Sequence, residues 1–180
     1  MAYGTIIPGL IIDGKPAPYG VVNERSVRAT AGIMFLIGIL TFFRIRTTGD
    51  YTALMVVVPL FWLDFLLKTV AGPMYSIFGI LGRFATRRQR PEWVGAAQKR
   101  FAWGIGLTLS SVMMIVSIGL QIRGWIPFGI CMTCLTFMWM ESALGICAGC
   151  KMYAWLQKIG WIAIPEHQPA CPGGVCSIKR

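Results

Sequence analysis

The sequence predicts an all-α membrane protein, a polytopic bundle of four transmembrane helices. Of its 180 residues, 56% are hydrophobic and only 13% are charged, against about 25% charged in ordinary soluble domains. The apolar residues come in long blocks rather than in amphipathic stripes, which is typical of membrane-spanning helices. A lipid bilayer is therefore the first partner that we expect.

Each of the four apolar blocks is long enough for a membrane helix. The expected spans are about 27–43, 51–70, 101–122 and 126–150. The second block continues as a further apolar segment at 72–82, and we expect the helix to break at Gly72-Pro73 because proline removes a helical hydrogen bond. This segment is expected to lie at the membrane interface or to re-enter the membrane. A five-span bundle, in which both pieces cross, is the alternative.

Two polar segments flank the predicted bundle. A Gly/Pro-rich arm forms residues 1–25, the bundle occupies 26–158, and a polar tail that contains cysteine forms 159–180. We expect no further folded domain in these segments.

The net charge of +10 is concentrated between the apolar blocks, where basic residues orient membrane helices. Most Lys and Arg residues lie in the arm, in the 83–100 connection and in the tail, whereas the opposite side has Arg44, Arg46 and Arg123. With four spans, the positive-inside rule places both termini in the cytoplasm. No basic stripe interleaved with aromatic residues is present, so nucleic acid is not an expected partner.

All six cysteines lie in the last fifty residues and form close pairs. The pairs are Cys131/Cys134, Cys147/Cys150 and Cys171/Cys176. On one continuous helix the first and fourth cysteines would be about 28 Å apart, so the two CxxC pairs cannot share one metal ion. Packing of cysteine as a small apolar side chain is the alternative to chemistry.

The first candidate site combines Cys131, Cys134 and Glu141. At 100° per residue these three side chains fall on one face of a helix. A CxxC pair can cycle between dithiol and disulfide, and Glu141 could accept the accompanying proton because burial raises the pKa of a carboxyl group. A hydrogen bond from Glu141 to a neighbouring helix is the alternative.

The second candidate site is the pair Cys147 and Cys150, as redox thiols or as metal ligands. Together with Cys171 and Cys176 they have a spacing compatible with four thiolates around zinc or an iron–sulfur centre. His167, in the same tail, is either a spare ligand or solvated.

Asp64 and Lys68 are four residues apart on a predicted span and can form an ion pair. Charged side chains at membrane depth usually face a bundle interior or a cavity. The pair either serves a function there or only offsets its own desolvation.

Three segments resemble an uncharacterised family of small bacterial integral membrane proteins, known only as a domain of unknown function (the family 4395 type). They are VNERSVRATAG at 22–32, KRFAWGIGL at 99–107 and ESALGICAGCKMY at 141–153, and the resemblance covers about residues 22–158. It implies that Cys147 and Cys150, with neighbouring glycines, are hallmark positions, and that the protein lies in the bacterial inner membrane.

Three functions stay open on this basis, and only some of them are enzymatic. The first is thiol–disulfide exchange or sulfur relay through Cys147 and Cys150, with a thioredoxin-like or sulfurtransferase partner. The second is transport of a small anion or sulfur species past Asp64, Lys68 and Glu141. The third is a non-catalytic accessory subunit of a larger membrane complex.

Overall fold

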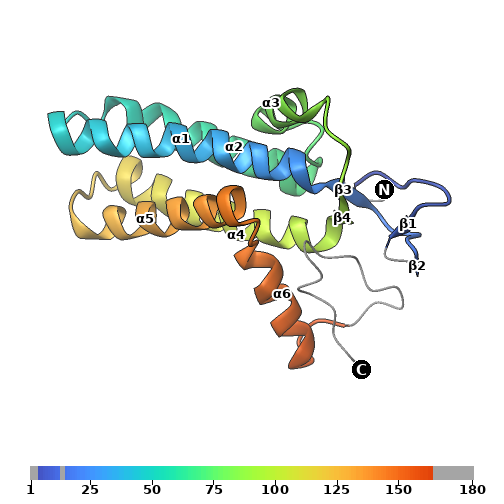
Figure 1. Ribbon diagram of the computed structural model, residues 1–180. Coiled ribbons are helices and arrows are strands. Elements are labelled where there is room, and N and C mark those ends of the chain that lie inside the picture. Colours follow the sequence, from blue (N-terminus) through green and yellow to red (C-terminus); the bar gives the residue numbers. More distant parts are fainter. Residues whose placement is uncertain (1–3, 13–14, 164–180) are drawn as a thin grey trace.

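The computed structural model describes residues 4–12 and 15–163, and it confirms a helical membrane bundle (Figure 1). Four helices are long and apolar enough to cross a membrane by length and composition. They are α1 (Glu24–Thr48), α2 (Thr52–Val70), α4 (Ala96–Met114) continued by the π-helical turn η1 (Ile115–Gly119), and α5 (Trp125–Trp139) continued by η2 (Met140–Leu144). Two shorter helices, α3 (Ile77–Thr86) and α6 (Ala148–Lys158), lie at the same end of the bundle.

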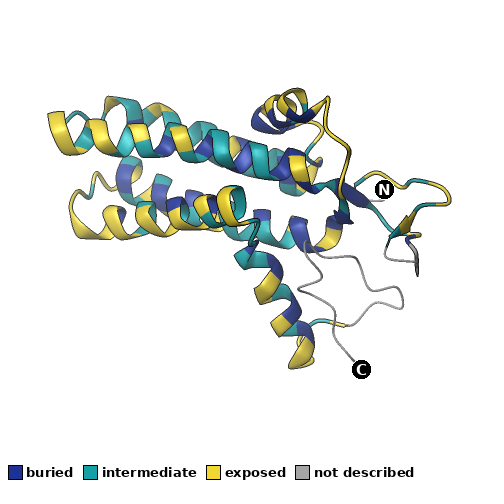
Figure 2. Ribbon diagram, in the orientation of Figure 1, coloured by how far each residue is buried: buried dark blue, intermediate teal, exposed yellow. Residues whose placement is uncertain are grey.

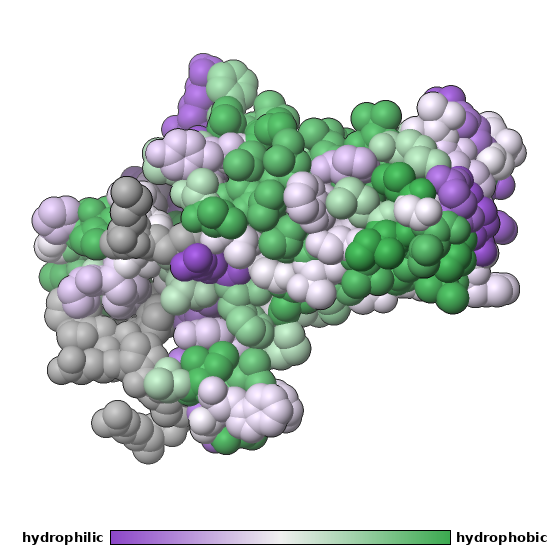
Figure 3. Space-filling view, turned by 180° about the vertical axis from the view of Figure 1, so that it is seen from behind, coloured by the Kyte–Doolittle hydropathy of each residue, from purple (hydrophilic) through white to green (hydrophobic). Residues whose placement is uncertain are grey.

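The outer surface of the long helices is apolar. Large hydrophobic side chains are exposed along α1 and α2, among them Leu36, Leu40, Phe43 and Val56. Apolar residues cover much of this surface, and hydrophilic residues gather at the end opposite α3 and α6, on the right in Figure 3. Exposed apolar surface of this extent fits contact with lipid chains rather than with water.

The segment predicted at 72–82 forms helix α3, which does not cross the bundle. It has 10 residues, whereas a transmembrane helix needs about 20. A Cβ on Gly82 would collide with the Thr30 hydroxyl of α1, so this glycine allows α3 to lie directly against α1. The described residues therefore support the four-span bundle and not the five-span alternative.

Four short strands were not expected from the sequence. Strand β1 (Ile11–Ile12) pairs with β2 (Lys15–Pro16), and β3 (Val21–Asn23) pairs antiparallel with β4 (Trp93–Gly95). The β3–β4 pair holds the start of α1 beside the start of α4. Figure 2 shows buried residues gathered where these strands, α3 and α6 join the long helices.

The prediction of one continuous helix over 126–150 is wrong. The helix ends at Leu144, Gly145 adopts a left-handed conformation with a φ of 66°, and α6 begins after Cys147. A left-handed glycine is a common helix terminator because it lacks the Cβ that would clash. Helix α6 therefore turns away from α5 and packs against α4.

Candidate functional site

A buried ionic cluster lies where α1, α4 and η2 meet. The ammonium of Lys99 is 2.7 Å from Glu24 Oε2 and 2.7 Å from Glu141 Oε1. Lys99 and Glu24 are fully buried, and the Glu141 side chain is 17% exposed. One ammonium thus faces two carboxylates, which leaves one carboxylate in excess as a potential base.

Local structure explains why these three side chains converge. Asn23 caps α1 by accepting the Arg25 N–H at 3.2 Å, which fixes Glu24 in the first turn. The Glu24 N–H donates to the Glu92 carbonyl at 2.7 Å, next to strand β4, so the first turns of α1 and α4 are side by side. Glu141 lies on η2, and such π-helical turns occur frequently at functional sites.

Cys147 and Cys150 lie at the start of α6, next to this cluster. Cys147 is the N-cap residue, and its Sγ accepts the backbone N–H of Cys150 at 3.3 Å. Lys99 interacts electrostatically with both thiols. A side-chain hydrogen bond with Cys147, together with burial, raises the pKa of Cys150. Cys147 is the thiol that caps the N-terminus of α6.

Glycines allow the thiol-bearing helix to approach its neighbours. A Cβ on Gly149 would lie 2.5 Å from the Cβ of Ala102 on α4, and one on Gly145 would lie 3.0 Å from the Arg28 guanidinium. A larger residue at Gly149 would push α6 away from α4, and with it the thiols away from Lys99.

Glu24 and Lys99 were missed as site residues. The sequence placed Lys99 in a charged connection, but the structure places it inside α4 with no exposed surface. A signal was nevertheless present, because the three segments that carry the family resemblance each contribute to the cluster. The first contains Glu24, the second Lys99, and the third Glu141 with the Cys147/Cys150 pair.

The structure does not join Glu141 to Cys131 and Cys134. These two thiols line a separate cavity of about 80 Å³ whose other lining residues are uncharged, whereas Glu141 contacts Lys99. The break at Gly145 redirects the chain, so Cys147 and Cys150 lie at the start of α6 and not on the helix that bears Glu141.

Asp64 and Lys68 form a buried ion pair, with Nζ 2.5 Å from Asp64 Oδ2. Asp64 Oδ1 also accepts the Ser76 hydroxyl at 2.6 Å and the Phe78 N–H at 3.0 Å. These bonds attach the start of α3 to α2, so the carboxylate has a structural role besides pairing with Lys68.

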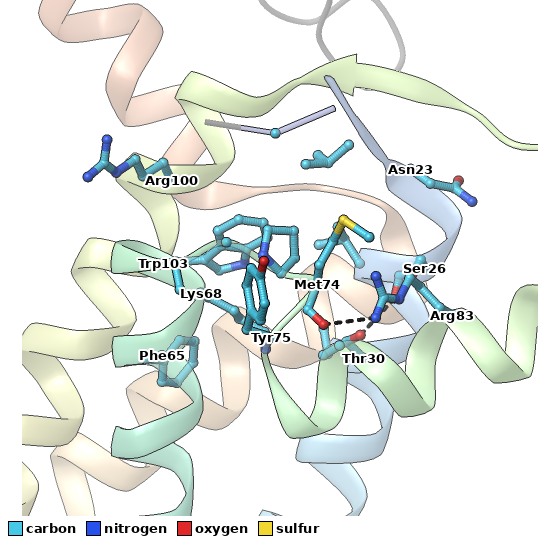
Figure 4. A pocket seen from close by; sticks show the side chains of 18 of the residues that line it. Asn23, Ser26, Thr30, Phe65, Lys68, Met74, Tyr75, Arg83, Arg100 and Trp103 are labelled. Atoms are coloured by element: carbon cyan, nitrogen blue, oxygen red, sulfur yellow. Dashed lines mark hydrogen bonds between the residues drawn. The ribbon is translucent and has the colours of Figure 1, made fainter. Parts of the chain in front are cut away.

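A cavity of about 810 Å³ lies at this end of the bundle. Both Lys68 and Glu141 line it, together with aromatic side chains that include Trp103, Tyr75 and Phe65 (Figure 4). Glu141 therefore faces the cavity and also contacts the ammonium beside the thiols.

The metal-site prediction stays a prediction. In residues 4–12 and 15–163, no group of three or more His, Cys, Asp and Glu side chains could hold a metal ion. Cys171, Cys176 and His167, which the prediction needs besides Cys147 and Cys150, lie outside the described residues.

The comparisons with known proteins agree with the resemblance seen in the sequence. No curated protein and no solved structure matches the chain. The family model described as "Domain of unknown function (DUF4395)" matches residues 22–158, a range that contains every residue of the ionic cluster and the Cys147/Cys150 pair. The protein belongs to this DUF4395 family.

Proposed function

We propose that this protein is a membrane thiol–disulfide exchange protein that reacts through Cys147 and Cys150. The observation that carries the proposal is the position of Cys147. Its sulfur caps the N-terminus of α6 and accepts the Cys150 N–H at 3.3 Å, beside an ammonium that two carboxylates hold in place. Exchange proceeds through a thiolate, and reactive cysteines commonly lie at helix N-termini and beside positive charges.

The reaction follows ordinary exchange chemistry. The Cys147 thiolate attacks one sulfur of a substrate disulfide, forms a mixed disulfide and releases the other sulfur as a thiolate. Cys150 then attacks the Cys147 sulfur, which forms the Cys147–Cys150 disulfide and releases the second substrate thiolate. The substrate gains two electrons, and its two leaving thiolates take up two protons, which balance the two protons that Cys147 and Cys150 lose.

The excess carboxylate of the cluster gives these protons a route. Glu141 contacts Lys99 at 2.7 Å and retains exposed surface. It can accept a proton when a thiol becomes a thiolate and deliver it to the cavity that it lines. In this role Glu141 is a positioning and proton-accepting residue rather than the nucleophile.

The expected partner is a thioredoxin-like or sulfurtransferase protein in the cytoplasm of a bacterium. The exposed arginines that follow α3 support this orientation, because basic residues concentrate on the cytoplasmic side. They are Arg87, Arg88 and Arg90. Both termini and α6 then lie on the cytoplasmic face of the inner membrane.

Trapping of the mixed disulfide tests the proposal. The purified, reduced protein in detergent is incubated with a thioredoxin-like protein that lacks its own resolving cysteine and whose remaining cysteine forms a disulfide with a small thiol, so that attack by Cys147 releases the small thiol. Cys150→Ser should accumulate the mixed disulfide, because Cys150 can no longer attack Cys147, whereas Cys147→Ser should form none. The double variant Cys131→Ser/Cys134→Ser is the matched control and should behave as the unmodified protein. Equal trapping by Cys147→Ser would overturn the proposal.

A further inference from the structure

The geometry points to the cavity of about 810 Å³ as the binding site of a lipid-soluble quinone that reoxidises the Cys147/Cys150 dithiol. This inference rests on the proposed function, with the exchange running in the reverse direction: a substrate dithiol reduces the Cys147–Cys150 disulfide, and the quinone then accepts the two electrons of the resulting Cys147/Cys150 dithiol. The volume lies within the range of about 300–1,000 Å³ for small-molecule sites.

The entrance of the cavity favours a ligand that arrives from lipid. Val70, Met74 and Tyr75 line the cavity and are also 68%, 57% and 68% exposed. Their exposed surface continues onto α3, where Ile77 and Ile80 are exposed too. A water-soluble ligand would leave these apolar side chains uncovered, whereas the apolar tail of a membrane quinone would cover them.

The interior has the groups that a quinone ring needs. Trp103, only 4% exposed, and Phe65 offer flat aromatic surfaces for stacking against a planar ring. Lys68 and Arg83 lie on different sides of the cavity (Figure 4), and both are nitrogen donors that can face a carbonyl oxygen. Arg83 donates one hydrogen bond to the Met74 carbonyl at 2.9 Å and has further N–H groups on its guanidinium.

Glu141 connects this cavity with the dithiol. It lines the cavity and contacts Lys99, and Lys99 interacts electrostatically with Cys147 and Cys150. In the overall step the dithiol loses two electrons and two protons, and one S–S bond forms between its sulfurs. The quinone gains both electrons and both protons and becomes a quinol, so no further oxidant is required.

Binding and reduction of a short-tailed benzoquinone can be measured separately on the full-length protein in detergent. The protein is first reduced and freed of reductant. Binding is followed by quenching of tryptophan fluorescence, and reduction by the loss of quinone absorbance. We expect one quinol per chain, and we expect Cys147→Ser/Cys150→Ser to bind quinone but to form no quinol.

A blocking variant tests the place of binding. Ala71 is exposed and lines the cavity, so Ala71→Trp should weaken quinone binding at least tenfold without disturbing packed core. Val56→Trp, which adds the same side chain to an exposed position of α2 outside the cavity lining, is the matched control and should bind as the unmodified protein does. Mixed-disulfide trapping by Cys150→Ser should be the same in both backgrounds.

The outcomes separate the two proposals. Absence of quinone binding, or binding that Ala71→Trp leaves unchanged, overturns the quinone site while trapping shows that the exchange activity stands. Binding without formation of quinol by the reduced protein overturns the electron transfer. Loss of trapping with intact quinone binding overturns the exchange function, on which the electron transfer depends.

Discussion

Lys99 and Glu24 form an ion pair at 2.7 Å in which both side chains are only 1% exposed, although 75 residues separate them in the chain. The pair joins the first turns of α1 and α4, and Glu141 joins it from η2. This relationship makes the ionic cluster a structural support of the bundle as well as the environment of the thiols.

Lys99→Met should destabilise the protein strongly. Removing the ammonium leaves two buried carboxylates without a counter-charge, which typically lowers the free energy of unfolding by about 3–5 kcal/mol. Thermal unfolding in detergent measures the loss. Lys151→Met, at an exposed position of α6, should change little, and an equal loss in both variants would contradict a special role for Lys99.

The Asp64–Lys68 pair should show strong coupling. Lys68→Met alone leaves the buried Asp64 carboxylate without its counter-charge and should lower the free energy of unfolding by about 3–5 kcal/mol. In Asp64→Asn/Lys68→Met the amide oxygen can still accept hydrogen bonds from Ser76 and Phe78, so much of this loss should be recovered. A double-mutant cycle of unfolding free energies measures the coupling, and simple additivity would refute it.

Gly149→Ala and Gly104→Ala should have opposite effects on stability. A Cβ on Gly149 meets the Ala102 Cβ at 2.5 Å, whereas nothing lies within 4 Å of a Cβ on Gly104. Overpacking should lower the free energy of unfolding of Gly149→Ala by about 1–3 kcal/mol. Removal of a helical glycine should raise the free energy of unfolding of Gly104→Ala by about 0.5–1 kcal/mol. Thermal unfolding checks both, and alkylation of Cys147 should change only in Gly149→Ala.

Alkylation of Cys147→Ser and Cys150→Ser should reveal unequal reactivity of the two thiols. A side-chain hydrogen bond with Cys147 and burial both raise the pKa of Cys150. Burial remains when Cys147 is replaced, so Cys150 in Cys147→Ser should react with iodoacetamide only well above the ordinary thiol pKa of about 8.5. Cys150→Ser, in which the capping thiol remains, should react at lower pH. Identical pH profiles of the two variants, determined by mass spectrometry, would exclude this asymmetry.

The turn between α1 and α2 should lose stability in acid. Hydrogen bonds from Thr52 and the Arg44 guanidinium lower the pKa of Asp50 to about 2, from an ordinary value of 3.8. The ionised carboxylate therefore stabilises the fold above pH 3.8, and this contribution disappears as the pH falls toward 2. The difference in Tm between the unmodified protein and Asp50→Asn should shrink over this range. A constant difference would show that ionisation of Asp50 is not its source.

Hydropathy predicted the membrane helices because lipid imposes a simple requirement on length and composition. It could not place Lys99, because a lysine in a charged connection has the same local pattern whether it is solvated or paired with distant Glu24. The break at Gly145 was equally ambiguous, since glycine is common inside membrane helices. Strands β3 and β4, of three residues each, are too short to show an alternating pattern.

The cysteine pairs show the same limit. Spacing within each CxxC motif was visible in the sequence, but the chemical difference between the pairs comes from their surroundings. Cys131 and Cys134 line an uncharged cavity, whereas Cys147 and Cys150 lie beside Lys99. Those surroundings are built from segments far apart in the chain, and only the folded structure reveals them.

The separation of the cluster residues along the chain also determines when the cluster can form during biosynthesis. The ribosome makes Glu24 first, Lys99 some 75 residues later and Glu141 only in the last membrane helix. Until that helix is inserted, Lys99 can pair only with Glu24, and Cys147 and Cys150 have not been synthesised. The reactive end of the protein is thus assembled last, and a nascent chain released before residue 141 would lack both Glu141 and the Cys147/Cys150 pair.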